Sequence, residues 1–344
     1  MIEFITLLLV GGLSLLSASF VYVIRIWARR REIYDIPNAR SSHILPTPRG
    51  GGLVIVAMTI FAGIWSLFFI QFQLVLVAYL IGGALIAVVS WLDDLRSVPN
   101  RTRFACHLVG AFFIVVSLVI AAPGELAGDS RLWWFFGPIV VTWIVGFTNI
   151  YNFMDGIDGL AACQAAIAAL WWLLVATQRS EPLVGMIALT LAAASIGFLL
   201  HNWAPAKIFM GDVGSAFLGY SFAVLPLIGF YMIGQLQVLI GGVLVVWPFI
   251  FDGTLTIIRR ALNGENIFQA HRSHLYQRMT IHGWAHRSVS LLYGGYMLIS
   301  ASCAFALVMD KNSWPLVALP LGFGVGLFAL VRRIEHPSMT MNGS

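Results

Sequence analysis

The chain has 344 residues, of which 59% are hydrophobic and only 10% are charged, and its mean hydropathy is +0.87. Soluble domains carry about 25% charged residues, so the composition excludes an ordinary soluble protein and predicts a polytopic membrane protein. The net charge of +5 does not indicate nucleic acid as a partner, because in a membrane protein such a charge first reports orientation.

Eleven apolar stretches are long enough for membrane-spanning helices, since a helix needs about 20 apolar residues to cross a bilayer. We therefore expect an all-α protein with about 11 transmembrane helices. No soluble domain or internal repeat is visible, so residues 1–344 are expected to form a single membrane-embedded domain. The predicted spans are Ile5–Trp27, Leu53–Ile70, Leu74–Trp91, Phe104–Ile120, Leu132–Ile150, Leu160–Ala176, Leu183–Leu200, Ala216–Ile233, Leu236–Ile258, Val289–Val308 and Trp314–Val331.

The arginines and lysines between the spans predict the orientation. The first span is followed by three arginines at positions 29–31, which places the N-terminus on the periplasmic side. If the sides alternate from there, all but three of the 20 Lys and Arg residues lie on the cytoplasmic side, as does the C-terminus; the exceptions are Arg131, Arg179 and Lys311. The cytoplasmic loops expected to carry the active site are residues 29–52, 92–103, 151–159, 201–215 and 259–288.

Three acidic motifs lie at span ends that the same alternation places in the cytoplasm. Asp93-Asp94 closes the third span, Asp155 and Asp158 follow the fifth, and Asp212 precedes the eighth. Carboxylates are costly near lipid, so those that remain usually do chemistry or bind ions. The orientation was set by arginines, so the agreement among the aspartates independently supports one cytoplasmic site. For the first pair alone, a solvated helix end is an equal alternative.

The segment from Asn149 to Gly159 is the most specific of these motifs. Asn149, Asn152 and Asp155 follow a three-residue step, so they can share one face of a helix end. Gly156 and Gly159 allow the backbone to turn or to approach a ligand closely. A helix C-cap would explain one Asn and one Gly but not the whole set.

The segment from Asn202 to Ser215 combines a cation with an acid. Lys207 can meet a phosphate as a point charge, and Asp212 can be an oxygen ligand for Mg²⁺. Gly211 leaves room beside Asp212. An interfacial loop with a snorkelling lysine and a helix N-cap would explain Lys207 and Ser215, but it explains Asp212 poorly.

The last long loop contains the sequence HRSHLYQR at residues 271–278. Imidazole and guanidinium groups together suit a phosphorylated substrate, which makes His271, Arg272, His274 and Arg278 candidate ligands. A zinc site is not supported, because no cysteine or third nearby ligand accompanies the histidine pair. The alternative is an amphipathic segment lying on anionic lipid.

Two further features are weaker. Asp252, near the end of the ninth span, is expected to pair with Arg259 or Arg260 or to cap structure. Three glycines at positions 50–52 precede the second span and could admit a phosphate or a lipid head group. Together, several aspartates and cations on one face suit Mg²⁺-dependent phosphoryl transfer involving a lipid, with Mn²⁺ as an alternative cation.

These motifs resemble those of the polyprenyl-phosphate N-acetylhexosamine-1-phosphate transferase superfamily over nearly the whole chain. Asp93-Asp94 matches its DD motif, residues 152–160 match NxxDGxDGL, residues 209–215 match FMGDxGS, and residues 271–275 are similar to its histidine loop. The peptidoglycan enzyme of this superfamily has consecutive histidines where this chain has the pattern HRxH. With the eleventh span, this pattern is more similar to the O-antigen-initiating branch.

The resemblance implies transfer of an N-acetylhexosamine 1-phosphate from a UDP-sugar to undecaprenyl phosphate, with release of UMP, at the bacterial inner membrane. The donor would be similar to UDP-N-acetylglucosamine or UDP-N-acetylfucosamine, and the product would start O-antigen or another cell-envelope glycan. A homodimer is a further expectation. Asp93 and Asp94 are implied as catalytic acids, and Asp212 with Asp155 as metal ligands. The expected substrate-binding residues are Asn152, Asp155, Asp158, Asn202, Lys207, Phe209, His271, Arg272, His274 and Arg278.

Several alternatives stay open at this stage. Asp93 could act as a base, as a positioning group or as a covalent nucleophile. A CDP-alcohol phosphatidyltransferase is the nearest other enzyme, but its DGxxAR pattern fails at the Ala-Arg positions, which are Gly159 and Leu160 here. An ion-coupled transporter would place its acids near the bilayer midplane in paired half-repeats, whereas these acids gather at one interface.

Overall fold

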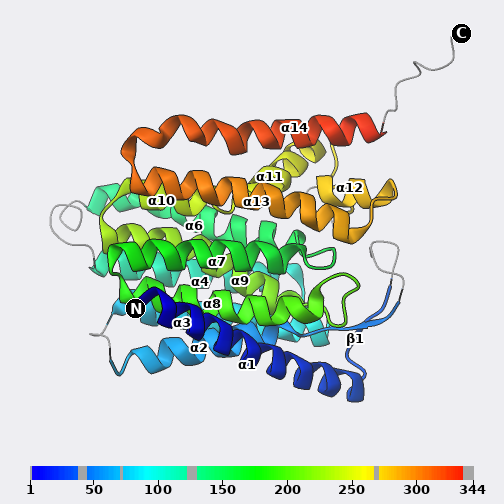
Figure 1. Ribbon diagram of the computed structural model, residues 1–344, viewed down its shortest axis with the longest axis horizontal. Coiled ribbons are helices and arrows are strands. Elements are labelled where there is room, and N and C mark those ends of the chain that lie inside the picture. The colour runs from blue at the N-terminus through cyan, green and yellow to red at the C-terminus, as the bar shows by residue number, and fades with distance from the viewer. Residues whose placement is uncertain (1, 38–44, 70–72, 122–129, 267–270, 336–344) are drawn as a thin grey trace, which may run out of the picture.

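A computed structural model describes residues 2–37, 45–69, 73–121, 130–266 and 271–335 as a bundle of long helices (Figure 1). A two-residue antiparallel ribbon joins β1 (Tyr34–Asp35) to β2 (Thr47–Pro48). The prediction of an all-α membrane protein is confirmed. The helices are α1 (Ile2–Arg30), α2 (Gly52–Ser66), α3 (Leu74–Leu95), α4 (Asn100–Ala121), α6 (Ser130–Phe153), α7 (Leu160–Arg179), α8 (Pro182–Asn202), α9 (Asp212–Ile233), α10 (Leu236–Leu244), α11 (Trp247–Leu262), α12 (Leu275–Ile281), α13 (His286–Met309), the 3-10 helix η1 (Lys311–Val317) and α14 (Ala318–Glu335).

Two of the eleven predicted spans are not simple crossings. Within the described ranges, nine helices are long and apolar enough to cross a membrane, or ten if a bent pair counts as one span. The second span is α2, whose 15 residues rise about 22 Å, short of a bilayer core of about 30 Å. The ninth is broken into α10 and α11, which meet at 65°. Pro248 in the first turn of α11 explains the break, because proline has no N–H to continue the preceding helix.

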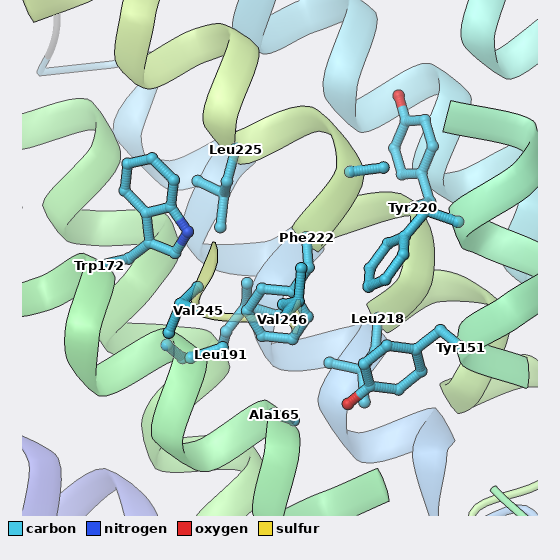
Figure 2. Close-up of a cluster of buried hydrophobic side chains, with 14 of the residues drawn as sticks. Tyr151, Ala165, Trp172, Leu191, Leu218, Tyr220, Phe222, Leu225, Val245 and Val246 are labelled. Atoms are coloured by element: carbon cyan, nitrogen blue, oxygen red, sulfur yellow. The ribbon is translucent and has the colours of Figure 1, made fainter. Parts of the chain in front are cut away.

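The central element of the bundle is α9, which is buried along most of its length and packs against α2, α3, α6 and α10. Its side chains meet those of α6, α7, α8 and the α10–α11 break in one cluster of aromatic and aliphatic groups, which includes Tyr151, Trp172, Leu191, Phe222 and Val245 (Figure 2). One pair of polar groups in the bundle interior binds each other: the Tyr79 and Ser221 hydroxyls are 2.9 Å apart.

The outer helices carry large apolar side chains on their exposed faces. Phe4, Leu7 and Leu8 of α1 are exposed, as are Leu319 and Val325 of α14. Outward-facing apolar groups are stable in contact with lipid tails, so these faces agree with the membrane assignment.

The fold gathers the predicted motifs at one end of the bundle. Helices α3, α6 and α8 end there, and α4, α7 and α9 begin there, so each motif lies at a turn between two helices. The ribbon, α12 and the C-terminal end of α1 lie at the same end (Figure 1). Residues 38–44, which include Arg40, and residues 267–270 belong to the predicted cytoplasmic loops but lie outside the described residues, as does the side chain of Arg131.

Candidate active site at one end of the helix bundle

Asp93 and Asp212 share a single cationic partner, Arg103 of α4. The Arg103 Nη1 atom lies 2.5 Å from Asp93 Oδ2 and 2.9 Å from Asp212 Oδ2. The other Asp93 oxygen accepts a hydrogen bond from the Val98 N–H at 2.7 Å, which fixes the turn between α3 and α4. One oxygen of each aspartate therefore points to the same position. The sequence reasoning did not single out Arg103, although its place ten residues after the Asp93-Asp94 pair, at the start of the next helix, is a signal.

Asp94 has a different environment from its neighbour. It is only 3% exposed, and its two oxygens accept the backbone N–H groups of Asp212 and Val213, each at 3.0 Å. Gly211 adopts a φ of +78°, and a Cβ at this residue would lie 2.7 Å from Asp94 Oδ2. Arg49 approaches from the other side, with Nη1 3.6 Å from Asp94 Oδ1 and a hydrogen bond to the Asp94 carbonyl. Asp94 thus caps α9 and positions Asp212.

The glycines before α2 allow two helix starts to approach closely. A Cβ at Gly52 would lie 2.3 Å from Gly214 Cα. The N–H groups of Gly51 and Gly52 donate to the carbonyls of Phe209 and Met210 at 3.0 and 2.9 Å. Gly52 therefore accommodates the start of α9, and the suggestion that residues 50–52 admit a phosphate or a lipid head group stays a prediction.

The motif after α6 reaches the same cluster. Asn152 Oδ1 accepts a hydrogen bond from the Ser215 hydroxyl at 2.5 Å, which connects the end of α6 to the first turn of α9. Desolvation raises the pKa of the Asp155 carboxyl well above its ordinary value, and the negative charges of Asp212 and Asp94 raise it further. Asp155 therefore lies in the electrostatic field of the other acids, where a bound cation would favour its ionised form.

Asn202 and Asp158 hold the loops of this end together. The side chain of Asn202 accepts the Gly159 N–H and donates to the Ile208 carbonyl, both at 3.0 Å. Asp158 Oδ2 accepts the Ala206 N–H at 3.0 Å. These two predicted substrate-binding residues connect the loop after α6 to the loop before α9, and the loop geometry depends on them.

Lys207 and Phe209 lie in the second of these loops. Lys207 is exposed. Phe209 is half-buried, and its backbone exchanges hydrogen bonds with Pro48 and Gly51, which places the strand-like segment after β2 beside the loop. An exposed lysine can contact a phosphorylated ligand without an initial cost of desolvation.

The histidine loop packs against the end of α6. The Tyr276 hydroxyl donates to the Phe153 carbonyl at 2.9 Å, and a Cβ at Gly156 would lie 2.1 Å from that hydroxyl. The rings of His271 and His274 are 5.0 Å apart and lie 6.2 and 6.4 Å from the Phe153 ring. The histidines are thus placed beside the loop that carries Asp155.

The side chains of this loop differ in charge and in partners. Desolvation, together with the smaller effects of the nearby His274 and Arg260, lowers the pKa of His271 to about 4, so the His271 ring is neutral at pH 7. Arg278 is buried and forms a two-fold ion pair with Glu335 of α14, with Nε 2.5 Å from Oε1. The substrate-binding role predicted for Arg278 has no support in this geometry, which shows the residue docking α12 onto α14.

Asp252 has partners that the sequence reasoning only partly anticipated. It accepts the N–H groups of Leu275 and Tyr276, so the prediction that it caps structure is confirmed. The predicted pairing with Arg259 or Arg260 is wrong. Arg260 pairs with Glu265, and Arg259 donates to the Ser273 carbonyl. The loop after α11 folds back on that helix and brings Ser273 to Arg259 and Leu275 to Asp252, which the local sequence pattern does not predict.

The cluster can be compared with the requirements of a divalent cation. Among the residues that the structure describes, no three Asp, Glu, His or Cys side chains are grouped closely enough to hold a metal by themselves. Mg²⁺ commonly takes only one or two carboxylates and completes its shell with substrate phosphates and water. The oxygens of Asp93 and Asp212, which already share one cation, fit that requirement.

Comparison with known proteins agrees with this chemistry. Residues 76–230 match the family model described as glycosyl transferase family 4. The chain is 35% identical over 267 residues to a probable undecaprenyl-phosphate N-acetylglucosaminyl 1-phosphate transferase of Bacillus subtilis, a match that covers 75% of this chain and 73% of that protein. It is 29% identical over 354 aligned positions to a decaprenyl-phosphate N-acetylglucosaminephosphotransferase of Mycobacterium tuberculosis, covering 90% and 85%. A phospho-N-acetylmuramoyl-pentapeptide-transferase of Latilactobacillus sakei is 32% identical over 200 residues, covering 53% and 61%.

Proposed function

Because this chain belongs to the polyprenyl-phosphate N-acetylhexosamine-1-phosphate transferase superfamily, we propose that it moves N-acetylglucosamine 1-phosphate from UDP-N-acetylglucosamine to undecaprenyl phosphate. The relatives from Bacillus subtilis and Mycobacterium tuberculosis are both named for N-acetylglucosamine and cover most of this chain. UDP-N-acetylfucosamine or a similar sugar is the second candidate donor. The product would begin a lipid-linked glycan of the bacterial envelope, such as O-antigen, from the cytoplasmic face of the inner membrane.

The observation that carries the proposal is the convergence of Asp93 and Asp212 on Arg103, with Asp155 in the same field. In the proposed reaction, an oxygen of the acceptor phosphate forms a bond to the β-phosphorus of the UDP-sugar. The bond from that phosphorus to the bridging oxygen breaks, and UMP leaves with both electrons. Asp212 with Asp155 or Asp93 would hold Mg²⁺, which would supply positive charge to the diphosphate.

The cations around the cluster suit the diphosphate. Arg272 Nε and His274 Nε2 are buried nitrogens without a hydrogen-bond partner among the described residues. Buried polar groups normally have partners, so such atoms point to a ligand. Lys207, in the loop before α9, is exposed. We assign these three side chains to the donor phosphates.

Asp93 is proposed as a positioning group for the acceptor side. Both oxygens of its carboxylate already accept hydrogen bonds, from Arg103 and from the Val98 N–H, and these bonds would have to break before Asp93 could attack phosphorus. A phosphate monoester has a second pKa near 6 and is largely dianionic at neutral pH, so it needs little base assistance. Exchange of labelled UMP into UDP-sugar by lipid-depleted enzyme, without acceptor, would instead establish a covalent Asp93 intermediate.

The decisive experiment measures UMP release by purified protein with undecaprenyl phosphate and a panel of UDP-sugars. We expect release with UDP-N-acetylglucosamine, its loss with EDTA, and its recovery with Mg²⁺ or Mn²⁺. The panel includes UDP-N-acetylfucosamine and a peptide-bearing UDP-N-acetylmuramic acid. Asp212→Asn, which keeps the volume but removes the charge, should be inactive with an unchanged melting temperature. No UMP release with any donor would contradict the proposal and favour the transporter alternative, whereas a CDP-alcohol donor would indicate the phosphatidyltransferase.

A further inference from the structure

Asp252 is a buried carboxylate on which three helices converge. It lies in α11 and is 0% exposed. Its Oδ1 accepts from His274 Nδ1 at 3.2 Å and from the Leu275 N–H at 2.9 Å. Its Oδ2 accepts from the Tyr276 N–H at 3.3 Å and from the hydroxyl of Tyr293, in α13, at 2.5 Å. A buried carboxylate with so many donors is fixed in one geometry, because each lost bond leaves a buried polar group unpaired.

Two features of α11 determine where Asp252 lies. The break before Pro248 turns α11 by 65° out of line with α10. It directs α11 toward the motif end, which is the end of the bundle that carries the sequence motifs. Gly253 then allows α11 to pack on α6, since a Cβ there would lie 2.6 Å from the Ile150 side chain. Helix α6 ends in the loop that carries Asp155, so this contact sets Asp252 relative to the proposed donor site.

The contact with Asp252 determines which nitrogen of His274 faces away. A carboxylate accepts hydrogen bonds and cannot donate one, so the ring proton lies on Nδ1. The remaining nitrogen, Nε2, is buried and has no hydrogen-bond partner within the described part of the chain. The ring itself is 3% exposed and stacks on His271 at 5.0 Å. The ring is therefore held in one orientation, with an unused nitrogen.

We propose that Asp252, assisted by Tyr293, is a positioning residue that accepts the Nδ1–H of His274 and fixes the orientation of the ring, so that the imidazolium form directs its Nε2–H to the diphosphate of the UDP-sugar. Asp252 itself does not touch the substrate and acts through His274. The same principle operates at metal sites, where a carboxylate accepts the N–H of one histidine ring nitrogen and thereby determines that the other nitrogen binds the metal. The inference rests on the proposed function for the identity of the ligand, but not for the geometry of the Asp252–His274 pair.

The first test does not need turnover. The protein is labelled with ¹⁵N-histidine in detergent micelles, and the His274 signals are assigned by their loss in His274→Gln. We expect the Nδ1-protonated tautomer in the wild type at pH 8, and a mixture of tautomers in Asp252→Asn, whose single oxygen cannot serve all the donors. A ligand-free wild-type ring that is protonated on Nε2 and not on Nδ1 overturns the inference, whether or not the protein releases UMP from any donor. Failure of the transferase assay alone would contradict only the proposed function.

The second test is a double-mutant cycle on kcat/KM for UDP-N-acetylglucosamine. We expect His274→Gln and Asp252→Asn each to lower kcat/KM by about tenfold to a hundredfold, as the loss of one hydrogen bond to a charged group implies. The kcat/KM of the double variant should equal that of the less active single variant, because both changes remove the same contact. Losses that multiply would show that Asp252 is merely structural and would overturn the inference.

Tyr293→Phe provides a milder version of the same cycle if Asp252→Asn does not fold. It removes one hydroxyl from Asp252 and nothing from His274, and we expect a smaller loss that disappears in the His274→Gln background. Tyr296→Phe is the matched control, because this buried tyrosine of the same helix donates to the Pro320 carbonyl at 2.8 Å instead. Its kcat/KM should remain at the wild-type value. Equal losses in Tyr293→Phe and Tyr296→Phe would contradict the inference.

Discussion

Individual charged residues at the motif end show how neighbours in sequence acquire different tasks. Asp93 and Asp94 are adjacent, yet Asp94 is buried against the first turn of α9 while Asp93 binds Arg103. The reason is helical geometry, since consecutive side chains point about 100° apart and meet different neighbours. Asp94 thus positions Asp212, and Asp93 joins Asp212 at the shared Arg103.

The first prediction concerns Arg103. In Arg103→Gln, Asp93 and Asp212 lose their shared cation, so they repel each other and no guanidinium competes for their oxygens. We expect a lower melting temperature in EDTA and half-maximal stabilisation at a lower Mg²⁺ concentration than in wild type, measured by thermal unfolding in detergent. Arg101→Gln, an exposed change on the same helix, is the control and should behave as wild type. An unchanged Mg²⁺ response in Arg103→Gln would contradict the shared-site geometry.

The second prediction concerns the pH dependence of stability at His271. Its pKa is lowered to about 4 in the folded protein, whereas an unfolded histidine has a pKa of about 6.5. Between these values the unfolded state binds a proton that the folded state does not, so stability falls as the pH is lowered through this window. His271→Asn and His271→Gln should therefore lose less melting temperature than wild type between pH 7 and pH 5. Equal losses in all three proteins would show that His271 is not desolvated as described.

At the scale of elements, the site depends on close contacts between helix starts. The first turns of α2 and α9 touch through Gly52 and Gly214, and Asp94 caps α9 through two backbone N–H groups. The break between α10 and α11 serves the same end, because it directs Asp252 to the histidine loop. Short or broken helices at these places are thus part of how the site is built.

The third prediction tests the contact between α2 and α9. Gly214→Ala would place a Cβ 2.6 Å from Gly52 Cα and 2.5 Å from Met210 Cγ, and overpacking of this kind costs about 1–3 kcal/mol. We expect a clear fall in melting temperature and in activity, because Asp212 lies in the same turn. Gly146→Ala in α6 is the control, since nothing lies within 4 Å of its Cβ and alanine favours a helix. Similar melting temperatures for the two variants would show that the helices separate freely.

At the scale of the molecule, the fold separates an apolar body from one charged end. The helix ends that carry the aspartate and histidine motifs belong to that end, while Arg179, in the last turn of α7, and Lys311, at the start of η1, lie at the opposite end of the bundle. This arrangement fits a lipid acceptor whose tail stays among apolar helices while its phosphate meets a water-soluble donor. The distribution of arginines predicts that the charged end faces the cytoplasm.

The fourth prediction tests this orientation. Single cysteines at Ser97 and Lys311 are introduced after the three native cysteines are replaced, and intact cells are treated with a membrane-impermeant maleimide. We expect labelling at position 311 and none at position 97, with labelling of both after the cells are opened. Labelling of position 97 in intact cells would reverse the orientation and exclude a cytoplasmic UDP-sugar as donor.

The sequence by itself determined the membrane class, the order of the apolar segments, the family and the aspartate and histidine motifs, because hydropathy, arginine bias and motif spacing are local properties of the chain. It did not determine that α2 is short, that the ninth span is broken, or which charged groups pair. Arg103 with Asp212 and Arg278 with Glu335 are contacts between helices distant in the chain, while Arg103 with Asp93 and His274 with Asp252 join neighbouring helices. Only the packing of the helices brings such groups within hydrogen-bonding distance. A buried polar group left unpaired costs free energy, and which groups become buried cannot be predicted from a local sequence pattern.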